Sequence, residues 1–375
     1  MKILITGTHL TPALAVINEL RKVKAIDILY VGRKTTREGD KTASMESSIL
    51  PRVGVKYLTI TTGRFQRNFT VYTIPSLLKI PVGIIQSLMI VSTQKPDVIL
   101  SFGGYLSFPI VLAGWLCSIP IIIHEQTLVP SLANRLAAIF AQKVAVSYDQ
   151  KFPYSKEKII LTGNPIRSEL LENGKEASGE IKDFVGQSIK KRLPLIYITG
   201  GNQGSHIINE TVESILKQLS KIAFIIHQTG DSKYKDYERI SFLVKKLKLE
   251  NRVLIYKWIN TPDLRLILDK TDMVISRAGI NTLMELAYFK VPALVIPYPF
   301  LYQNEQVVNA KYFEKRGLVK VLLQSDLSGK ELLQKIEELL TPRELIKKLD
   351  TNGESLVKDA AKRIAIETIS LCKKG

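Results

Sequence analysis

The sequence predicts an α/β protein built from two Rossmann-like domains. Short apolar runs of strand length recur along the chain, and helix-length segments separate several of them, which is the alternation typical of a parallel sheet. A second series of the same kind begins near Leu193. At about 150 residues per domain, a chain of 375 residues has room for two or three domains.

The first series contains six predicted strands. The chain opens on a short apolar run that leads directly into a glycine turn, without the longer apolar core and cleavage site of a signal peptide, so we expect a buried first strand. The strands are KILIT, DILYVG, DVILSFGG, PIIIHEQ, KVAVS and KIILTGNP.

Residues 106–123 form an uncharged stretch of eighteen residues, long enough to consider as a transmembrane segment. Pro109 and Pro120 divide it into a helix-length piece and a strand-length piece. We therefore expect a buried helix followed by a core strand.

Residues 47–96 contain six basic residues and no acidic one, and within them Phe69–Val91 is strongly apolar. One interpretation is a core helix with a solvated basic rim. The other is an apolar patch, framed by Arg64, Arg67 and Lys79, that rests on an anionic membrane.

The second series predicts the strands LPLIYITGG, AFIIHQTG, RVLIYKWI, DMVISRAG and PALVIPYP. We place the domain boundary near residues 165–168, giving a first domain over 1–165 and a second over 166–352. The polar stretch 173–191 is a loop or an irregular helix, and the segment from Gly353 has the pattern of a Lys-rich amphipathic helix.

The composition excludes several classes of protein. With 45% hydrophobic and 23% charged residues, the chain is an ordinary globular protein rather than a disordered or collagen-like one. Two cysteines indicate a reducing compartment without a disulfide framework, and four histidines argue against a His-rich metal site. The net charge of +18 favours an acidic partner, such as nucleic acid, anionic lipid or phosphate groups.

Glycine-rich turns follow strands in both series. Such turns bring backbone amides to a helix N-terminus, where an anion is favoured, and five of them indicate a cleft for a phosphorylated ligand. Neither a P-loop nor a G-x-G-x-x-G string is present, and no D-x-D pair holds a metal for a nucleotide-sugar enzyme. The turns contain Gly7, Gly103-Gly104, Gly163, Gly200-Gly201 with Gly204, and Gly279.

Seven strings, in this order, resemble the MurG family of N-acetylglucosaminyltransferases from Met1 to about residue 320. HEQ followed by a LANR-like string is fairly specific, whereas TGG and SRAG alone fit many GT-B transferases. The strings are SFGGYLSFP, HEQTLVPSLANR, TGNPIR, TGGNQGSHIIN, HQTG, SRAGINTLMEL and NEQVVNA.

The resemblance implies a GT-B fold with two domains facing a central cleft, and an inverting, metal-independent transferase that needs no cofactor. The donor would be UDP-N-acetylglucosamine, bound mainly by the second domain. The acceptor would be lipid I, converted to lipid II for peptidoglycan and met by the first domain at the cytoplasmic face of the cell membrane, where the enzyme is peripheral. The helix at about 353–375 would pack back on the first domain.

The resemblance also implies a set of donor-binding residues. Glu285 would accept the ribose hydroxyls, unless it is a solvated helix residue, and Arg167 would neutralise phosphate, unless it forms an interdomain salt bridge. Ile259 would contact uracil through its backbone, and Gln306 would bind the sugar hydroxyls next to Glu305, where the family has Gln, Asn or His. The turn residues Gly201, Asn202, Gln203 and Gly279 complete the set.

For the first domain the resemblance implies His9, His124 and Glu125 as catalytic candidates. An alternative interpretation of His124 is a core histidine whose ring nitrogens are hydrogen-bonded within the protein. Because adjacent strand residues point to opposite faces, His124 and Glu125 can share a face only if the strand has already ended. The expected acceptor-binding residues are Gly103, Gly104, Tyr105, Gln126 and Asn134.

The first loop departs from the family, which opens G-x-G-T-G-G-H-x-x-P-A. This chain reads ITGTHLTPA and lacks two glycines before His9. A shorter loop must reposition His9 and removes the flexible turn that would wrap the acceptor pyrophosphate. We expect His9 to remain anchored from its C-terminal side.

Three functions compete. The first is the lipid II-forming transferase. The second is a related GT-B enzyme, either a transferase for another lipid or a nucleotide-sugar epimerase, which the HEQTLVPSLANR string disfavours. The third is a catalytically weakened, membrane-bound UDP-sugar-binding protein, suggested by the missing glycines. A nucleic-acid binder fits the charge, but no nucleic-acid motif supports it.

Overall fold

The computed structural model describes residues 1–35, 44–63, 73–171, 176–201, 203–340 and 359–372. The chain divides into two compact units. The first unit comprises Met1–Ser168 and Val357–Gly375, and the second comprises Glu169–Leu356. Arg64, Arg67 and Asn202 lie outside the described residues.

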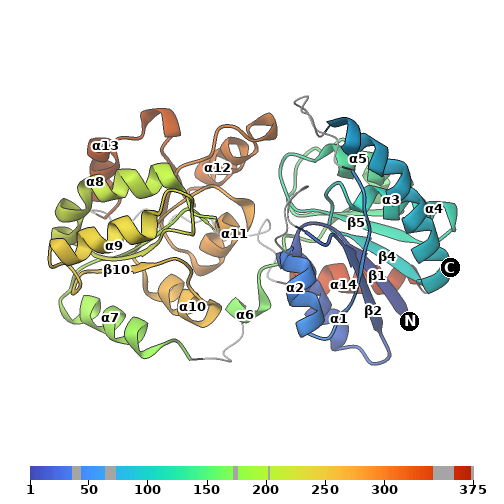
Figure 1. Ribbon diagram of the computed structural model, residues 1–375, viewed down its shortest axis with the longest axis horizontal. Coiled ribbons are helices and arrows are strands. Elements are labelled where there is room, and N and C mark those ends of the chain that lie inside the picture. Colours follow the sequence, from blue (N-terminus) through green and yellow to red (C-terminus); the bar gives the residue numbers. More distant parts are fainter. Residues whose placement is uncertain (36–43, 64–72, 172–175, 202, 341–358, 373–375) are drawn as a thin grey trace. The chain divides into compact units, whose positions relative to one another are not determined.

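The first unit is built on a seven-stranded sheet in the order β3-β2-β1-β4-β5-β6-β7 (Figure 1). All neighbouring strands run parallel. The strands are β1 (Lys2–Thr6), β2 (Asp27–Gly32), β3 (Lys56–Thr59), β4 (Val98–Ser101), β5 (Ile121–Glu125), β6 (Lys143–Val146) and β7 (Ile159–Leu161). The sequence did not predict β3, because this edge strand is only partly buried and has no apolar run.

Helices cover both faces of this sheet. Residues of α1, α2 and α14 pack with Ile3 and Ile5 in one apolar cluster, whereas α3, α4 and α5 pack with Leu4 in the other. The helices are α1 (Leu10–Arg21), α2 (Met45–Arg52), α3 (Thr73–Gln94), α4 (Ser107–Leu116), α5 (Leu132–Phe140) and α14 (Ala360–Cys372), with the short η1 (Lys156–Lys158).

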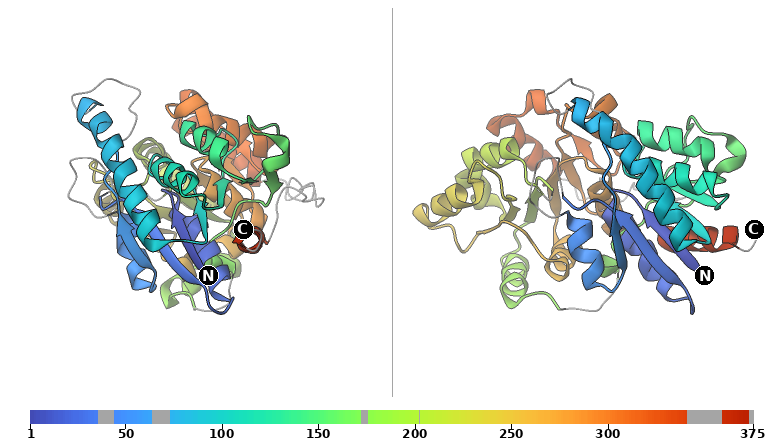
Figure 2. Two further views of the ribbon diagram at one scale, coloured as in Figure 1. Left: turned by 90° about the vertical axis from the view of Figure 1, so that its right-hand side faces the viewer. Right: turned by 45° about the vertical axis from the view of Figure 1, so that its right-hand side comes forward.

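The last helix, α14, belongs to the first unit. Ile364, Ala365 and Leu371 enter the cluster around β1, so the two ends of the described chain lie near each other (Figure 2). The Lys143 ammonium of β6 also pairs with the Glu367 carboxylate at 2.5 Å.

The uncharged stretch 106–123 folds as predicted. It forms α4 and then the fully buried strand β5, with the break just before Pro120. Across the described part of the chain, no helix has both the length and the apolar character needed to cross a membrane.

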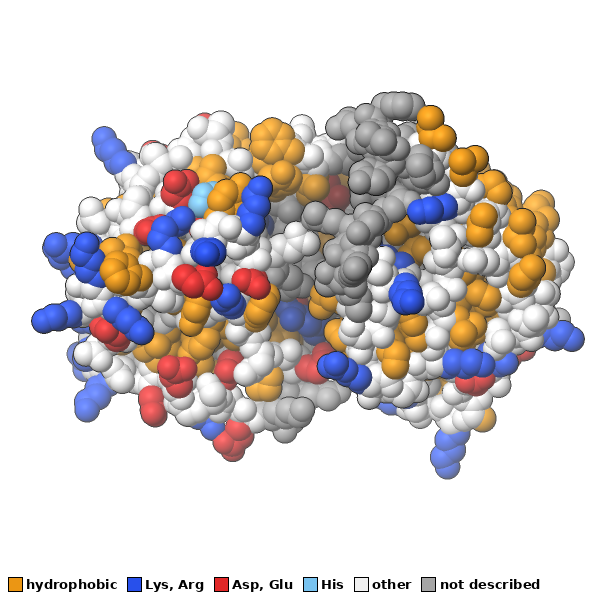
Figure 3. Space-filling model, viewed as in Figure 1, with side chains coloured by type: hydrophobic (Ala, Val, Ile, Leu, Met, Phe, Trp, Pro, Cys, Tyr) orange, Lys and Arg blue, Asp and Glu red, His pale blue; other side chains and the backbone are white. Residues whose placement is uncertain are grey.

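Helix α3 has one buried and one exposed side. Val91 and Ser87 are buried, and Gly83 approaches Thr62 so closely that an added Cβ would lie 2.5 Å from the Thr62 Cβ. On the opposite side, apolar side chains recur every three or four residues and remain exposed, as the orange groups over α3 show in Figure 3. These exposed residues are Ile74, Leu78, Val82, Ile85 and Met89.

The next two helices continue this exposed apolar surface. Helix α3 packs against α4, and α4 packs against α5. We call the surface the three-helix apolar face, and in addition to the α3 residues it contains Trp115 and Leu116 of α4 and Leu132, Leu136 and Ile139 of α5.

The second unit contains a six-stranded parallel sheet in the order β10-β9-β8-β11-β12-β13. The strands are β8 (Leu195–Thr199), β9 (Phe224–Gln228), β10 (Val253–Tyr256), β11 (Met273–Ser276), β12 (Ala293–Val295) and β13 (Lys320–Val321). Strand β13 has only two residues and was not predicted.

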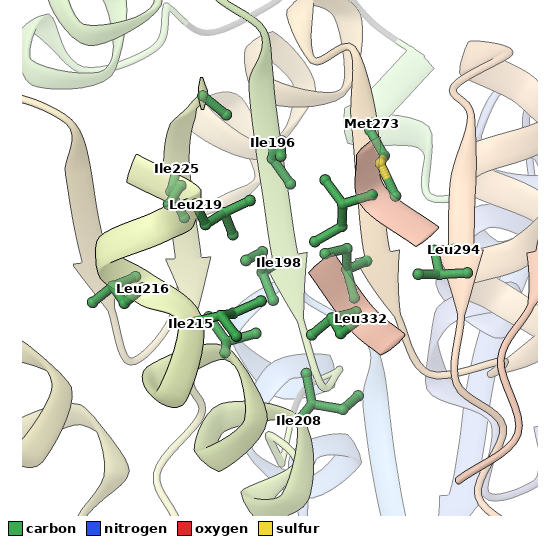
Figure 4. Packing of buried hydrophobic residues seen from close by; sticks show 14 of the residues in the cluster. Ile196, Ile198, Ile208, Ile215, Leu216, Leu219, Ile225, Met273, Leu294 and Leu332 are labelled. Carbon is green, nitrogen blue, oxygen red and sulfur yellow. The ribbon is translucent and has the colours of Figure 1, made fainter. Parts of the chain in front are cut away.

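Helices α8, α9 and α13 pack on one face of this sheet, where Ile196 and Ile198 of β8 meet Ile215 and Leu332 (Figure 4). On the other face, Phe184 of α7 packs edge-on against Phe224. The helices are α6 (Ser168–Leu171), α7 (Gly179–Lys190), α8 (His206–Ile222), α9 (Asp236–Lys246), α10 (Thr261–Lys270), α11 (Ile280–Phe289), η2 (Tyr302–Asn304), α12 (Glu305–Lys315), η3 (Gln324–Asp326) and α13 (Gly329–Leu340). Much of the uncertain stretch 173–191 is therefore the regular helix α7.

Both sheets reverse their strand order once. In the first unit the reversal lies between β1 and β4, and in the second between β8 and β11. Ligands of open parallel sheets bind at the carboxyl ends of the strands beside such a reversal. The two places to search for a site are therefore the loops after β1 and β4, and those after β8 and β11.

Candidate active site

The shortened first loop packs directly on the glycine turn after β4. The Thr8 N–H donates to the Gly103 carbonyl at 3.0 Å. Gly104 has a φ of +90°, and a Cβ on it would lie 2.2 Å from the Thr8 hydroxyl oxygen. The Tyr30 hydroxyl donates to the Gly7 carbonyl at 2.9 Å. The loop is therefore fixed from both neighbouring strands.

His9 is the N-cap residue of α1, but its side chain accepts no capping hydrogen bond there. Burial, reinforced by the positive charge of Arg33, lowers the pKa of His9 to about 4. The imidazole is therefore neutral at pH 7, which is the form that can accept a proton.

His124 is buried within β5. Its Nε2 lies 3.3 Å from the Gly163 carbonyl oxygen and 3.2 Å from the Ser147 hydroxyl oxygen. The ring packs edge-on against Phe102, and burial lowers its pKa to about 3. The Nδ1 atom is buried and has no hydrogen-bond partner among the described residues, so His124 is only partly satisfied as a core histidine. The catalytic role of His124 stays a prediction.

Glu125 is buried and surrounded by donors. One carboxylate oxygen accepts from the Thr127 N–H at 3.2 Å and lies 3.0 Å from the Thr127 hydroxyl. The other accepts from the Asn134 amide at 2.8 Å and from the Tyr154 hydroxyl at 3.1 Å. Burial raises the pKa of Glu125 despite these bonds. Because β5 includes both residues, the His124 and Glu125 side chains point to opposite faces of the sheet and have different partners. Their catalytic roles stay predictions.

Asn134 links Glu125 to the glycine turn. Its amide nitrogen bonds the Glu125 carboxylate, while its amide oxygen would lie 2.7 Å from a Cβ at Gly103. Gln126, which follows Glu125 in the sequence, is buried, and Tyr105 is half-buried directly after the turn. The structure thus brings Asn134, Glu125 and the turn after β4 together, with His9 on the adjoining loop.

In the second unit, the turns after β8 and β9 pack on each other. A Cβ on Gly204, where φ is +73°, would lie 1.9 Å from the Thr229 carbonyl oxygen, so only glycine fits. A Cβ on Gly201 would meet nothing within 4 Å. The turn is therefore tightly packed at Gly204, whereas there is free space beside Gly201, close to the start of α8. Gln203, between these two glycines, is exposed.

A buried polar network holds this turn in place. His227 bonds the Asn209 amide oxygen through Nε2 at 2.9 Å. The Asn209 amide nitrogen donates to the Thr229 carbonyl and to the Asp236 carboxylate, both at 3.0 Å. These bonds join the starts of α8 and α9, and they explain the HQTG string as a structural element.

Gln228 bridges the turn to Ile259. It accepts from the Ile259 N–H at 3.2 Å and donates to the Gly201 carbonyl at 3.4 Å. Of the Ile259 backbone groups that were predicted to contact uracil, the N–H is thus already in use, whereas the carbonyl oxygen remains available as an acceptor.

The loop after β11 opens α11, with Gly279 at its N-cap. An added Cβ at Gly279 would meet only the Thr282 hydroxyl, at 3.9 Å, so this position is also open. Glu285 lies one and a half turns into α11 and is 6% exposed, which rules out a solvated helix residue.

Three further side chains lie near the end of β12 or in the linker. Gln306 accepts from the Tyr298 N–H through its amide oxygen at 2.8 Å, which turns its NH₂ group away from the loop. Burial raises the pKa of its neighbour Glu305. Arg167 is half-buried and belongs to the end of the first unit.

Sequence reasoning missed several residues that shape these sites. Thr127 and Tyr154 bind Glu125. Thr127 directly follows the HEQ string and could have been found from that position, whereas nothing in the sequence pointed to Tyr154. Arg277, within the SRAG string, donates to the Ile296 carbonyl at 3.0 Å and lies over the Tyr298 ring. Within the described residues, no three His, Cys, Asp or Glu side chains are grouped to hold a metal ion.

Two Rossmann-like units with glycine turns at both strand-order reversals have the GT-B architecture. The solved structure of Acinetobacter baumannii MurG shares this fold, with a TM-score of 0.72 at 22% identity over 98% of this chain and 99% of that one. Residues 4–146 match the glycosyltransferase family 28 N-terminal domain, and residues 195–364 match its C-terminal domain.

Two relatives carry the name UDP-N-acetylglucosamine–N-acetylmuramyl-(pentapeptide) pyrophosphoryl-undecaprenol N-acetylglucosamine transferase. The protein from Halothermothrix orenii is 35% identical over 379 residues, which cover 99% of this chain and 97% of that protein. The protein from Thermoanaerobacter sp. strain X514 is 34% identical over 364 residues, covering 96% and 95%. The chain belongs to glycosyltransferase family 28 and, within it, to the MurG family of N-acetylglucosamine transferases.

Proposed function

We propose that this protein transfers N-acetylglucosamine from UDP-N-acetylglucosamine to the C4 hydroxyl of the muramoyl sugar of lipid I, which forms lipid II for peptidoglycan. The observation that carries the proposal is the near-full-length match, over both domains, to relatives named for this transfer. The reaction is a single inverting displacement, in which the acceptor oxygen bonds C1 of the donor sugar as UDP leaves.

The donor binds in the second unit, at the openings beside Gly201 and Gly279. Both openings lie at helix N-termini, where backbone N–H groups stabilise a diphosphate. The buried Glu285 carboxylate accepts the ribose hydroxyls, and the Gln306 NH₂ group donates to the sugar. The loop amides of the second unit stabilise the charge that develops on UDP, with no metal ion.

The acceptor binds in the first unit, beside the Gly103–Gly104 turn. His9 is the base in this scheme, because it is carried by the loop that packs on that turn. It takes the proton of the C4 hydroxyl as that oxygen attacks the donor sugar. The four hydrogen bonds of Glu125, from Thr127, Asn134 and Tyr154, support a structural role in which it positions Asn134 and the loop that contains Gln126.

The protein binds the cytoplasmic surface of the cell membrane peripherally, through the three-helix apolar face. Exposed apolar patches of this kind mark interaction sites. The α3 part of this face belongs to residues 47–96, which contain six basic and no acidic residues, so electrostatic attraction to anionic lipid adds to apolar insertion.

The test is a transfer assay with UDP-N-acetylglucosamine labelled in the sugar and a short-chain lipid I analogue, with and without EDTA. Label in the lipid product, unaffected by chelation, supports the proposal. A donor converted to its 2-epimer without transfer would identify an epimerase instead.

The alternative of a weakened sugar-nucleotide-binding protein is favoured by one observation, the loss of two glycines before His9. UDP binding without transfer, combined with transfer after insertion of two glycines behind Thr8, would support that alternative. The same insertion should leave an active parent enzyme equally or more active.

A further inference from the structure

Arg33 lies at the same sheet edge as the first loop. Strands β1 and β2 are paired in parallel up to Thr6 and Val31, and Arg33 is the first residue after β2. The Tyr30 hydroxyl of β2 reaches across to the Gly7 carbonyl at 2.9 Å. The position that follows β2 therefore adjoins the loop that carries His9.

The backbone of Arg33 is fixed by two hydroxyl groups. Its carbonyl accepts from the Ser44 hydroxyl at 2.7 Å and from the Tyr57 hydroxyl at 2.6 Å. The Tyr57 ring passes over Gly32, where a Cβ would lie 2.4 Å from the Tyr57 hydroxyl oxygen. The sequence therefore needs glycine before Arg33 so that this support can form.

The side chain of Arg33 is also held. A guanidinium nitrogen lies 3.6 Å from the carboxylate of Glu46, whose side chain is only 3% exposed. Glu46 stands in the first turn of α2, whose N-cap Ser44 also bonds the Arg33 carbonyl. One helix start thus orients both the backbone and the guanidinium.

The positive charge of Arg33 acts on the candidate acceptor site. It is one of two causes that lower the pKa of His9, and it also affects the pKa of Tyr57, which in turn responds to Tyr105. The guanidinium of Arg33 therefore acts electrostatically on His9 at the carboxyl edge of the sheet.

We propose that Arg33 binds the diphosphate of the acceptor and supplies by charge what the absent glycines of the first loop do not supply by backbone amides. The short loop is tied to Gly103 through Thr8 and has no slack to wrap a diphosphate. The planar guanidinium can bind two phosphate oxygens at once. This inference rests on the proposed function.

The start of α1 supports the same assignment. The first N–H groups of a helix have no partner within the helix, and at α1 these belong to Leu10 and Thr11, since Pro12 has none. The first turn contains no acidic side chain, and His9 does not cap it. A phosphate held by Arg33 beside His9 would meet these two donors.

The experiment compares two acceptor analogues that carry the same sugar and short prenyl chain, one with a diphosphate link and one with a monophosphate link. Arg33→Met and Arg33→Lys are the test variants. Arg21→Met is the matched control, because Arg21 is an exposed arginine of the same unit that donates to the Val53 carbonyl.

Arg33→Met should raise KM for the diphosphate acceptor about 10-fold or more and leave kcat within a few-fold, since a charge-assisted hydrogen bond is lost. Its KM for the monophosphate acceptor should change much less. Arg33→Lys should fall between Arg33→Met and the parent, and Arg21→Met should match the parent on both acceptors. UDP affinity should be the same in all four proteins.

An equal rise in KM on both acceptors, or no rise at all, would overturn the role of Arg33. If Arg33→Met fails to fold, the Arg33→Lys comparison decides the question. Calorimetric titration of the diphosphate analogue tests the Arg33 site independently of the proposed transferase function. Weaker binding to Arg33→Met without any transfer by the parent would support the Arg33 site and contradict the transferase function.

Discussion

Glu125 offers a sharp test of how this site works, because its sequence position and its surroundings favour different roles. The resemblance makes it a candidate base. In the structure both carboxylate oxygens are already engaged, by Thr127 on one side and by Asn134 and Tyr154 on the other. We expect a positioning residue, and Glu125→Gln and Glu125→Ala should separate the two roles.

The cost of Glu125→Gln follows from counting its bonds. The new amide oxygen can accept from Asn134 and Tyr154, and the new NH₂ group can donate to the Thr127 hydroxyl oxygen, whose own proton goes to the Val129 carbonyl 2.8 Å away. Only the bond from the Thr127 N–H is lost, which costs about 1–2 kcal/mol. For a domain of this size, that lowers Tm by roughly 2–8 °C.

Glu125→Ala removes every acceptor and leaves the donors of Asn134, Thr127 and Tyr154 without their partner. At about 1–3 kcal/mol for each buried unsatisfied group, and with some relaxation, we expect a loss of about 3–5 kcal/mol. The first unit should then melt roughly 6–20 °C lower.

The assay pairs thermal melting with transfer to the lipid I analogue. Glu125→Gln should keep transfer within about 10-fold of the parent, because a general base is worth about 10²–10⁴-fold and this residue is not one. Thr127→Val is the matched control, since it removes one partner and leaves the carboxylate. A Glu125→Gln protein with the parent's melting curve and transfer reduced by 100-fold or more would refute our reasoning.

Four further predictions follow from the same structure. His9→Ala should lower kcat by at least about 100-fold with unchanged UDP affinity, and equal activity would move the base elsewhere. Glu285→Ala should weaken UDP binding by about 1.5–3 kcal/mol in calorimetry, the range for hydrogen bonds to a charged group. The pKa values of His124 and His227 in the folded state are about 3 and about 4, below the ordinary value of 6.5. At pH values between these limits, the unfolded chain therefore binds more protons than the folded protein. Stability should therefore be lost as pH falls from 6.5 towards 4, and His227→Gln should flatten that decline in melting experiments. Ile139→Glu with Met89→Glu should reduce sedimentation with anionic vesicles without changing UDP affinity, whereas equal binding to neutral and anionic vesicles would contradict the electrostatic contribution.

The sequence predicts those strands whose residues are all buried, because such strands are continuous apolar runs in the sequence. Strands β5 and β9 are buried along their whole length, and their sequences IIIHE and FIIHQ stand out accordingly. Strand β3 is an edge strand with the sequence KYLT, and half-exposed side chains carry no such signal. The sequence did not distinguish helix α7 from a loop, because only four of its residues are buried and the rest of the stretch is polar. The buried residues are Ile181, Phe184, Val185 and Ser188.

The candidate site was predictable as a set of residue types but not as a set of contacts. The strings around His124 and Glu125 indicate chemistry, yet their partners Ser147, Gly163 and Tyr154 come from later strands and loops. Arg33 stands in no motif, and only the pairing of β1 with β2 brings it beside the first loop. Such long-range neighbours depend on tertiary structure, which a local pattern does not contain.

The return of α14 to the first unit has a consequence for the order of synthesis. The second unit is one contiguous stretch, so it can fold as soon as its own residues have left the ribosome. The first unit consists of two segments of the chain, and Ile364 and Leu371 complete the cluster around β1 only after the second unit has been synthesised. During that interval α1 and α2 cover this face of the sheet without α14, and the apolar surface that α14 buries later is exposed to aggregation and to chaperones. A truncation that removes α14 would therefore impair the folding of the first unit rather than that of the second.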